Sequence, residues 1–107
     1  PSSINSIISF ILTNIRSLIP KRDQLSNVVT STDSNFVILT ETWLNPSISN
    51  ADVQLYFPDF DVFRCDRVNR RGGGVLLGAH RSLQYCRVVI SSPLGILFIR
   101  CTAAYPP

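Results

Sequence analysis

The sequence predicts one α/β or α+β layered domain, or part of one, with a sheet rich in antiparallel hairpins. Two apolar runs of strand length, Ile7–Thr13 and Phe36–Thr40, flank a segment with helical spacing. Later apolar runs are short and are separated by turn residues, which is typical of hairpins. The 107 residues are 45% hydrophobic and 16% charged, so a modest packed core is expected.

The first half of the chain predicts a strand, a helix and a second strand. Ile7–Thr13 is expected to form the first strand, which Asn14 closes. Ser17 is a plausible cap for the helix that follows, and Pro20 suits its first turn. The apolar stripe of this helix is expected to consist of Leu25, Val28 and Val29. With Phe36–Thr40 as the second strand, the pattern favours a βαβ-type or split unit whose strand ends share one sheet edge.

The second half predicts one helical turn and two hairpins. Ala51–Leu55 is the expected turn, after a polar loop. Asn69–Gly74 is a turn between two strand-like runs, and Ser91–Gly95 separates two more. The four runs are Asp61–Cys65, Val75–Ala79, Cys86–Ile90 and Ile96–Cys101.

Charge and cysteine content limit the classes of partner. The net charge of +3 permits a polyanion partner without demanding one. No apolar stretch approaches the ~20 residues of a membrane span, so no membrane partner is expected. Cys65, Cys86 and Cys101 form no Cys-x-x-Cys pair, which makes a zinc site improbable and favours reduced thiols in an intracellular protein.

Glu41 is the only glutamate in the chain, and it follows a strand-like apolar run directly. A buried strand aims the side chain at its end, which suits a metal or catalytic site. The alternative is a strand-end glutamate that faces water. Asn14 closes the first apolar run in the same way, and this parallel favours the functional interpretation of both residues.

A basic segment precedes a run of three glycines. Its arginines are Arg64, Arg67, Arg70 and Arg71, followed by Gly72–Gly74. One interpretation is a phosphate-binding turn, with contacts that position DNA without choosing its sequence. The other is a hairpin whose arginines are solvated, with Asp66 pairing one of them. The expected phosphate- or DNA-binding residues are Arg16, Arg70, Arg71, Gly72 and Gly73.

Four segments, in this order, resemble one protein family. They are Thr13–Leu18, Leu39–Leu44, Arg70–Val75 and Tyr105–Pro107. The chain resembles the N-terminal half of the endonuclease/exonuclease/phosphatase superfamily. Within that superfamily, the amino-acid sequences of the first three segments are similar to the apurinic-endonuclease-like domain of non-LTR retrotransposon polyproteins. The resemblance begins near Leu12, so residues 1–107 would be a partial domain in which residues 1–9 are an unrelated flank.

The resemblance implies a four-layer αββα sandwich with an active site at one edge. It implies that Glu41 binds Mg²⁺ (or Mn²⁺), that Asn14 neighbours the metal or phosphate, and that Tyr105 lies beside the scissile phosphate. The implied reaction is hydrolysis of a phosphodiester in DNA. A single carboxylate suffices as the first protein ligand, because Mg²⁺ keeps several waters.

Two departures from the family pattern bear on activity. The family's Asp-x-Asn and closing Ser-Asp-His segments have no counterpart here, and His80, the only histidine, is expected to be a surface or strand-end residue. The chain is therefore expected to be inactive alone. Its implied partners are DNA, the missing C-terminal half and a downstream reverse transcriptase, with a nuclear location if functional. The alternatives are a non-catalytic remnant or binding module, and a phosphatase of the same superfamily.

Overall fold

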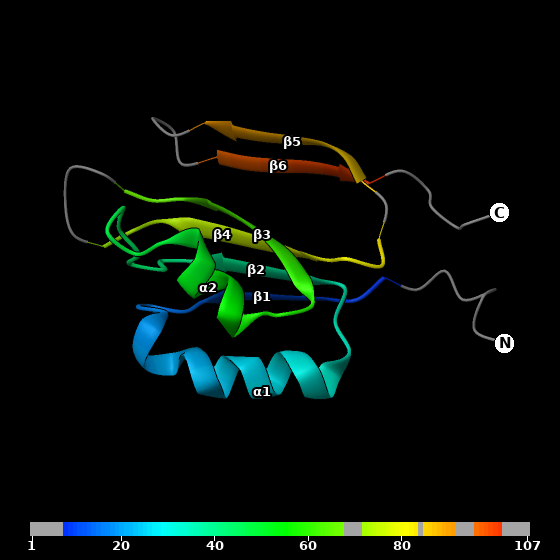
Figure 1. The fold of residues 1–107 in the computed structure, drawn as a ribbon, viewed down its shortest axis with the longest axis horizontal. Coiled ribbons are helices and arrows are strands. Elements are labelled where there is room, and N and C mark those ends of the chain that lie inside the picture. Colours follow the sequence, from blue (N-terminus) through cyan, green and yellow to red (C-terminus); the bar gives the residue numbers. More distant parts are fainter. Residues whose placement is uncertain (1–7, 68–71, 84, 92–95, 102–107) are drawn as a thin grey trace, which may run out of the picture.

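A mixed four-stranded sheet organises the chain (Figure 1). The computed structural model describes residues 8–67, 72–83, 85–91 and 96–101. The strands are β1 (Phe10–Asn14), β2 (Phe36–Thr40), β3 (Phe60–Cys65) and β4 (Val75–His80), in the spatial order β1-β2-β4-β3. β1 and β2 are parallel, whereas β4 is antiparallel to both of its neighbours. The predicted βαβ unit and the predicted β3–β4 hairpin are thus both confirmed.

The helix between β1 and β2 starts later than predicted. Helix α1 spans Arg22–Thr32 and follows a 3-10 turn at Ile19–Lys21, which contains Pro20. The prediction of Ser17 as its cap was wrong: the N-cap is Lys21, without a side-chain hydrogen bond, and the backbone of Ser17 is left-handed, with φ of 81°. Ser17 instead donates its backbone N–H to the carbonyl of Glu41, a tertiary contact that outweighs local capping.

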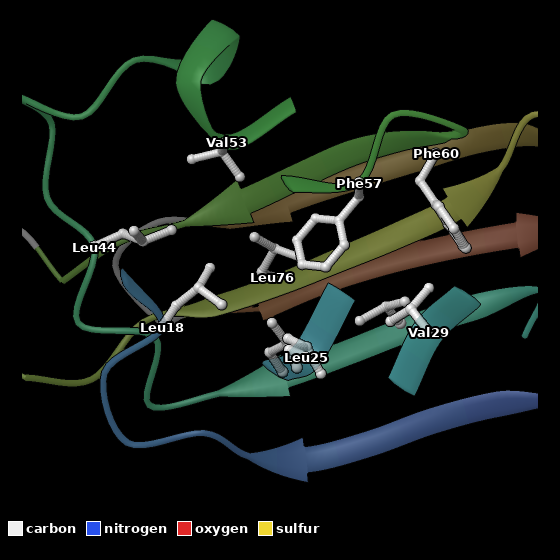
Figure 2. Packing of buried hydrophobic residues seen from close by; sticks show 10 residues of the cluster. Leu18, Leu25, Val29, Leu44, Val53, Phe57, Phe60 and Leu76 are labelled. Atoms are coloured by element: carbon white, nitrogen blue, oxygen red, sulfur yellow. The ribbon is translucent and has the colours of Figure 1, made fainter. Parts of the chain in front are cut away.

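Both helices contribute to one apolar core (Figure 2). Leu25 and Val29 of α1 are buried as predicted, but Val28 is 47% exposed, because only one narrow stripe of the helix meets the sheet. Helix α2 (Asn50–Tyr56) confirms the predicted helical turn, and Ser49 caps it by accepting the backbone N–H of Asp52 at 3.1 Å. The buried cluster consists of Leu18, Leu25, Val29, Val37, Leu39, Leu44, Val53, Phe57, Phe60 and Leu76.

A second, two-stranded sheet completes the described layers. β5 (Tyr85–Ser91) pairs antiparallel with β6 (Ile96–Cys101), which confirms the other predicted hairpin. This sheet contacts β3 and β4, and in Figure 1 it lies on the side of the strands opposite α1. Among the described residues, no helix has the length and apolar character that a bilayer crossing requires. The architecture is a mixed α+β fold with two sheets, as predicted.

The second sheet covers the first unevenly. Leu12, Ile38 and Leu77 are directly paired across β1, β2 and β4, so their side chains share one face of the sheet. Leu77 is only 8% exposed, Ile38 is half-buried, and Leu12 is 64% exposed. Phe10 and Ile8, at the same edge, are 59% and 52% exposed. An apolar face, which we call the β1 face (Ile8, Phe10 and Leu12), therefore lies open.

Candidate functional site

The two polar residues predicted to close neighbouring strands meet at one edge of the sheet. Asn14 is the last residue of β1 and lies in register with Thr40, the last residue of β2. The backbone N–H of Ile15 donates to the carbonyl of Thr40 at 3.0 Å, so the pairing continues past the strand ends. Asn14 is exposed and Glu41 is half-buried, which leaves both side chains accessible. The parallel βαβ arrangement thus places the backbone of Asn14 and of Glu41 at the same edge of the sheet, as the predicted strand order required.

Backbone hydrogen bonds hold the loop after β2 on both sides. On one side, Ser17 and Leu18 donate their N–H groups to the carbonyls of Glu41 and Thr42, both at 2.9 Å. On the other side, Thr42 donates to the carbonyl of Gly74 at 3.3 Å, and Trp43 donates to that of Gly73 at 2.9 Å. A loop bonded along both edges has little freedom. The backbone position from which the Glu41 side chain projects is therefore fixed by its neighbours on both sides.

Left-handed backbone conformations concentrate at this edge. Arg16 and Glu41 have φ of 48° and 57°, and Ser17 and Trp43 have 81° and 59°. Such conformations cost energy for residues other than glycine, and they persist where surrounding structure enforces them. Lys21 contributes to this enforcement, because its Nζ donates to the carbonyls of Ile15 at 2.7 Å and Arg16 at 3.1 Å. Strain of this kind is often found at functional sites.

The Glu41 carboxylate has an aromatic partner. The indole Nε1–H of Trp43 donates to its Oε1 atom at 3.1 Å. The indole lies over Gly72, where an added Cβ would sit 3.6 Å from Nε1. Within the described residues, Glu41 makes no other side-chain hydrogen bond or ion pair. Its second oxygen is thus available to a ligand.

The glycines before β4 allow close packing at the same edge. The guanidinium of Arg67 lies across Gly73, where a Cβ would come within 2.6 Å of Nε. Gly74, with φ of 90°, faces Thr42, whose Oγ1 would be 2.6 Å from a Cβ. Arg67 is exposed and, among residues that the structure describes, has no ion-pair partner. Arg67 was recognised from the sequence as part of the basic segment but was not among the expected phosphate- or DNA-binding residues; its position a few residues before the glycines was the available signal.

Of the other expected or candidate arginines, Arg64 and Arg16 lie within the described residues. Arg64 is structural: it pairs with Asp66 at 2.6 Å, both side chains are 9% exposed, and it also donates to the carbonyl of Asn45 at 2.8 Å. The expected pairing of Asp66 with one arginine is confirmed. Arg70 and Arg71 lie outside the described residues, as does Tyr105. Arg16 is exposed in the loop after β1.

The oxygen donors at this edge could contribute to the binding of a hydrated magnesium ion. In the part of the chain that the structure describes, no group of three or more His, Cys, Asp or Glu side chains converges. His80 ends β4 and shares a 2.8 Å hydrogen bond between its Nδ1 and Ser82 Oγ. Cys65 is buried as a free thiol. One accessible carboxylate with a nearby amide is compatible with Mg²⁺, which takes oxygen ligands and keeps most of its waters.

Comparisons with solved structures identify the fold. No protein-family model matches the sequence, and the comparison with curated proteins found no match. The chain resembles the 3′ phosphatase NExo from Neisseria bound to a product DNA hairpin, with a TM-score of 0.63, 15% identity and 79% of this chain covered. It also resembles an AP endonuclease from Archaeoglobus fulgidus, with a TM-score of 0.62, 13% identity and 81% covered.

These likenesses define the class of fold. The chain shares its fold with part of the AP endonuclease and 3′ phosphatase structures, in agreement with the predicted α+β fold class. The matched region spans about a third of those chains, 31% and 33%. Resemblance at such low identity establishes the fold alone.

Proposed function

We propose that this chain is part of a divalent-metal-dependent DNA endonuclease that hydrolyses phosphodiesters. The observation that carries the proposal is the position of Glu41 directly after β2, in a loop that backbone bonds hold on both sides and at the same sheet edge as Asn14. The proposal is that this edge presents the carboxylate and the amide to the same ligand, and the likeness of the fold to that of an AP endonuclease supports it. Hydrated magnesium and a DNA phosphate are the ligands that this chemistry fits.

Each residue of the edge has a place in this proposal. Glu41 would bind Mg²⁺ (or Mn²⁺), and the Asn14 amide would orient a phosphate oxygen. When bound, the metal stabilises charge on the phosphate and lowers the pKa of a bound water. The guanidinium of Arg67, with Arg16, would attract the DNA backbone, and Gly72 and Gly73 would let it approach closely. Roles for Tyr105, Arg70 and Arg71 belong to the same proposal.

The biological setting that we propose is target-site nicking for a non-LTR retrotransposon. The support is the sequence resemblance of three segments to the endonuclease domain of such elements: Thr13–Leu18, Leu39–Leu44 and Arg70–Val75. This setting implies a nuclear site of action, a complementary second half of the domain and a reverse transcriptase as partners. Genomic sequence adjoining the segment tests it: Asp-x-Asn and Ser-Asp-His segments followed by a reverse transcriptase support the setting, whereas a stop codon favours a non-catalytic remnant.

Replacing Glu41 by glutamine is expected to abolish binding of Mn²⁺ by the chain. The substitution removes the negative charge and keeps the shape, so the loss would report the carboxylate itself. Titration with Mn²⁺, followed by the electron paramagnetic resonance signal of the free ion, measures the affinity. Asp52→Asn, on the exposed first turn of α2, is the matched control and should leave binding unchanged. Equal affinity of Glu41→Gln and the unaltered chain would refute the metal assignment.

The chain alone is expected not to nick DNA. Within the described residues the site offers one carboxylate and no histidine, because His80 lies at the other end of β4 from Gly74 and bonds Ser82. General acid–base catalysis contributes about 10²–10⁴-fold to such reactions, and nothing among these residues replaces it. A supercoiled-plasmid assay with Mg²⁺ measures nicking. Nicking by the purified chain that Glu41→Ala removes would overturn this prediction.

A 3′ phosphatase activity is the second candidate, because one solved structure of this fold is described as a 3′ phosphatase. The two activities share a phosphate electrophile and differ in the bond that is cleaved. Assays of the whole domain on a 3′-phosphorylated duplex and on an intact duplex distinguish them. Release of phosphate without strand cleavage would favour the phosphatase.

A further inference from the structure

We propose that Trp43 is a positioning residue for Glu41, with its indole N–H fixing the carboxylate for a divalent cation. The inference rests on the proposed function. It starts from an unusual side chain: Trp43 is the only tryptophan, is 39% exposed, and has a left-handed backbone with φ of 59°. Bulky residues rarely adopt that conformation, so the surrounding structure must enforce it.

Two contacts enforce the placement of Trp43. Its backbone N–H donates to the carbonyl of Gly73 at 2.9 Å, and its ring lies over Gly72. A Cβ at position 72 would already be in van der Waals contact with the indole, 3.6 Å from Nε1, and Gly72 itself has φ of 85°. The absence of side chains in the glycine run therefore lets the indole ring pack against the backbone. This role of the glycines is additional to the one expected from the sequence, in which they let a phosphate approach the backbone closely.

The hydrogen bond to Glu41 has the right chemistry for holding a metal ligand. The indole nitrogen is a donor only, and its bond to Oε1 at 3.1 Å leaves the lone pairs of the other oxygen for a ligand. A lysine or arginine in the same place would neutralise the carboxylate and compete with the cation. A neutral N–H donor orients the carboxylate and keeps its full negative charge. Hydrogen bonds of this kind to metal ligands typically affect affinity about 10–100-fold.

The test measures Mn²⁺ affinity of the whole 107-residue chain by the resonance signal of the free ion. Trp43→Phe keeps an aromatic ring and removes the N–H, and we expect affinity to fall about tenfold, the lower end of the range because Trp43 is partly exposed. Tyr56→Phe, on α2, removes a polar hydrogen from another aromatic residue and should leave affinity unchanged. Affinity of Trp43→Phe within twofold of the unaltered chain would overturn the inference.

Two isosteres separate the N–H from the packing of the ring. At position 43, benzothienylalanine has sulfur in place of the N–H and should reproduce the loss, whereas 5-fluorotryptophan keeps the N–H and should bind normally. Equal binding by both isosteres would refute a role for the hydrogen bond, even if Trp43→Phe fails to fold.

A fluorescence measurement separates this inference from the proposed function. Because Trp43 is the only tryptophan, Mn²⁺ bound at Glu41 should quench its emission, and Glu41→Gln should remove the quenching. If Glu41→Gln leaves both binding and quenching unchanged, the metal site itself is wrong, and the inference falls with it. If Glu41→Gln abolishes binding and benzothienylalanine does not weaken it, the role of Trp43 alone is refuted.

Discussion

Gly74→Ala is expected to lower the free energy of unfolding by about 3 kcal/mol, a large share of the stability of a domain this small. Two costs add. The φ of 90° is unfavourable for alanine, and conformations of this kind cost about 1–3 kcal/mol. The new Cβ would also lie 2.6 Å from Oγ1 of Thr42, which is 1% exposed and cannot move aside easily. Such overpacking costs about 1–3 kcal/mol. Urea unfolding followed by circular dichroism measures the effect.

Gly78→Ala is the matched control for this substitution. Gly78 lies within β4, has no positive φ, and a Cβ there meets Phe60 at an ordinary 3.5 Å. Its replacement should change stability by less than about 1 kcal/mol. Combining Gly74→Ala with Thr42→Ala should relieve the clash and keep the backbone cost. Equal unfolding midpoints for Gly74→Ala and Gly78→Ala would contradict the account of Gly74.

The isolated chain is expected to self-associate through the β1 face, and Leu12→Gln is expected to reduce this association strongly. Leu12 is 64% exposed beside the half-buried Ile38, on the strand at the edge of the sheet opposite β3 and β4, which are the strands that β5 and β6 mainly contact. At about 25 cal/mol per Å², a few hundred Å² of open apolar surface correspond to several kcal/mol. Faces of that size promote association. Sedimentation velocity at several concentrations measures it.

Leu55→Gln provides the control for the association experiment. Leu55 is 76% exposed, more than Leu12, but it stands on α2 and away from the β1 face. The same chemical change there should leave association unaltered. A chain that stays monomeric at all concentrations, with a sharp and reversible thermal transition, would show that the β1 face is covered in some other way.

Local patterns were sufficient to predict the elements that build the core. Phe36–Thr40 is a β-branched and aromatic run bounded by polar residues, and β2 has these bounds. Leu25 and Val29 are four residues apart, and both are buried on α1. The position of Asn14 beside Glu41 followed from the parallel βαβ connection. These features follow from the periodicity of apolar residues and from the order of the elements, and both can be obtained from a single sequence.

Features decided by tertiary contacts could not be predicted in the same way. Serine is a common helix-capping residue, but the backbone N–H of Ser17 donates a hydrogen bond to the carbonyl of Glu41, which is distant in sequence. The strand order places β4 between β2 and β3, and the local pattern of the hairpin does not indicate which of its two strands pairs with β2. The bond from Trp43 to Glu41 needs two left-handed residues, and neither residue type signals that conformation.

The backbone bonds around Glu41 join three segments that are distant along the chain, near Ser17, Thr42 and Gly73. Contacts between distant segments form slowly, because each must first overcome the entropy of closing a long loop. The local packing of α1 on β2 has no such delay. An intermediate in which β1 and β2 have paired around α1, before β4 docks, would have the bonds from Ser17 and Leu18 to this loop but not those to Gly73 and Gly74. The loop that bears Glu41 would then be held on one side only.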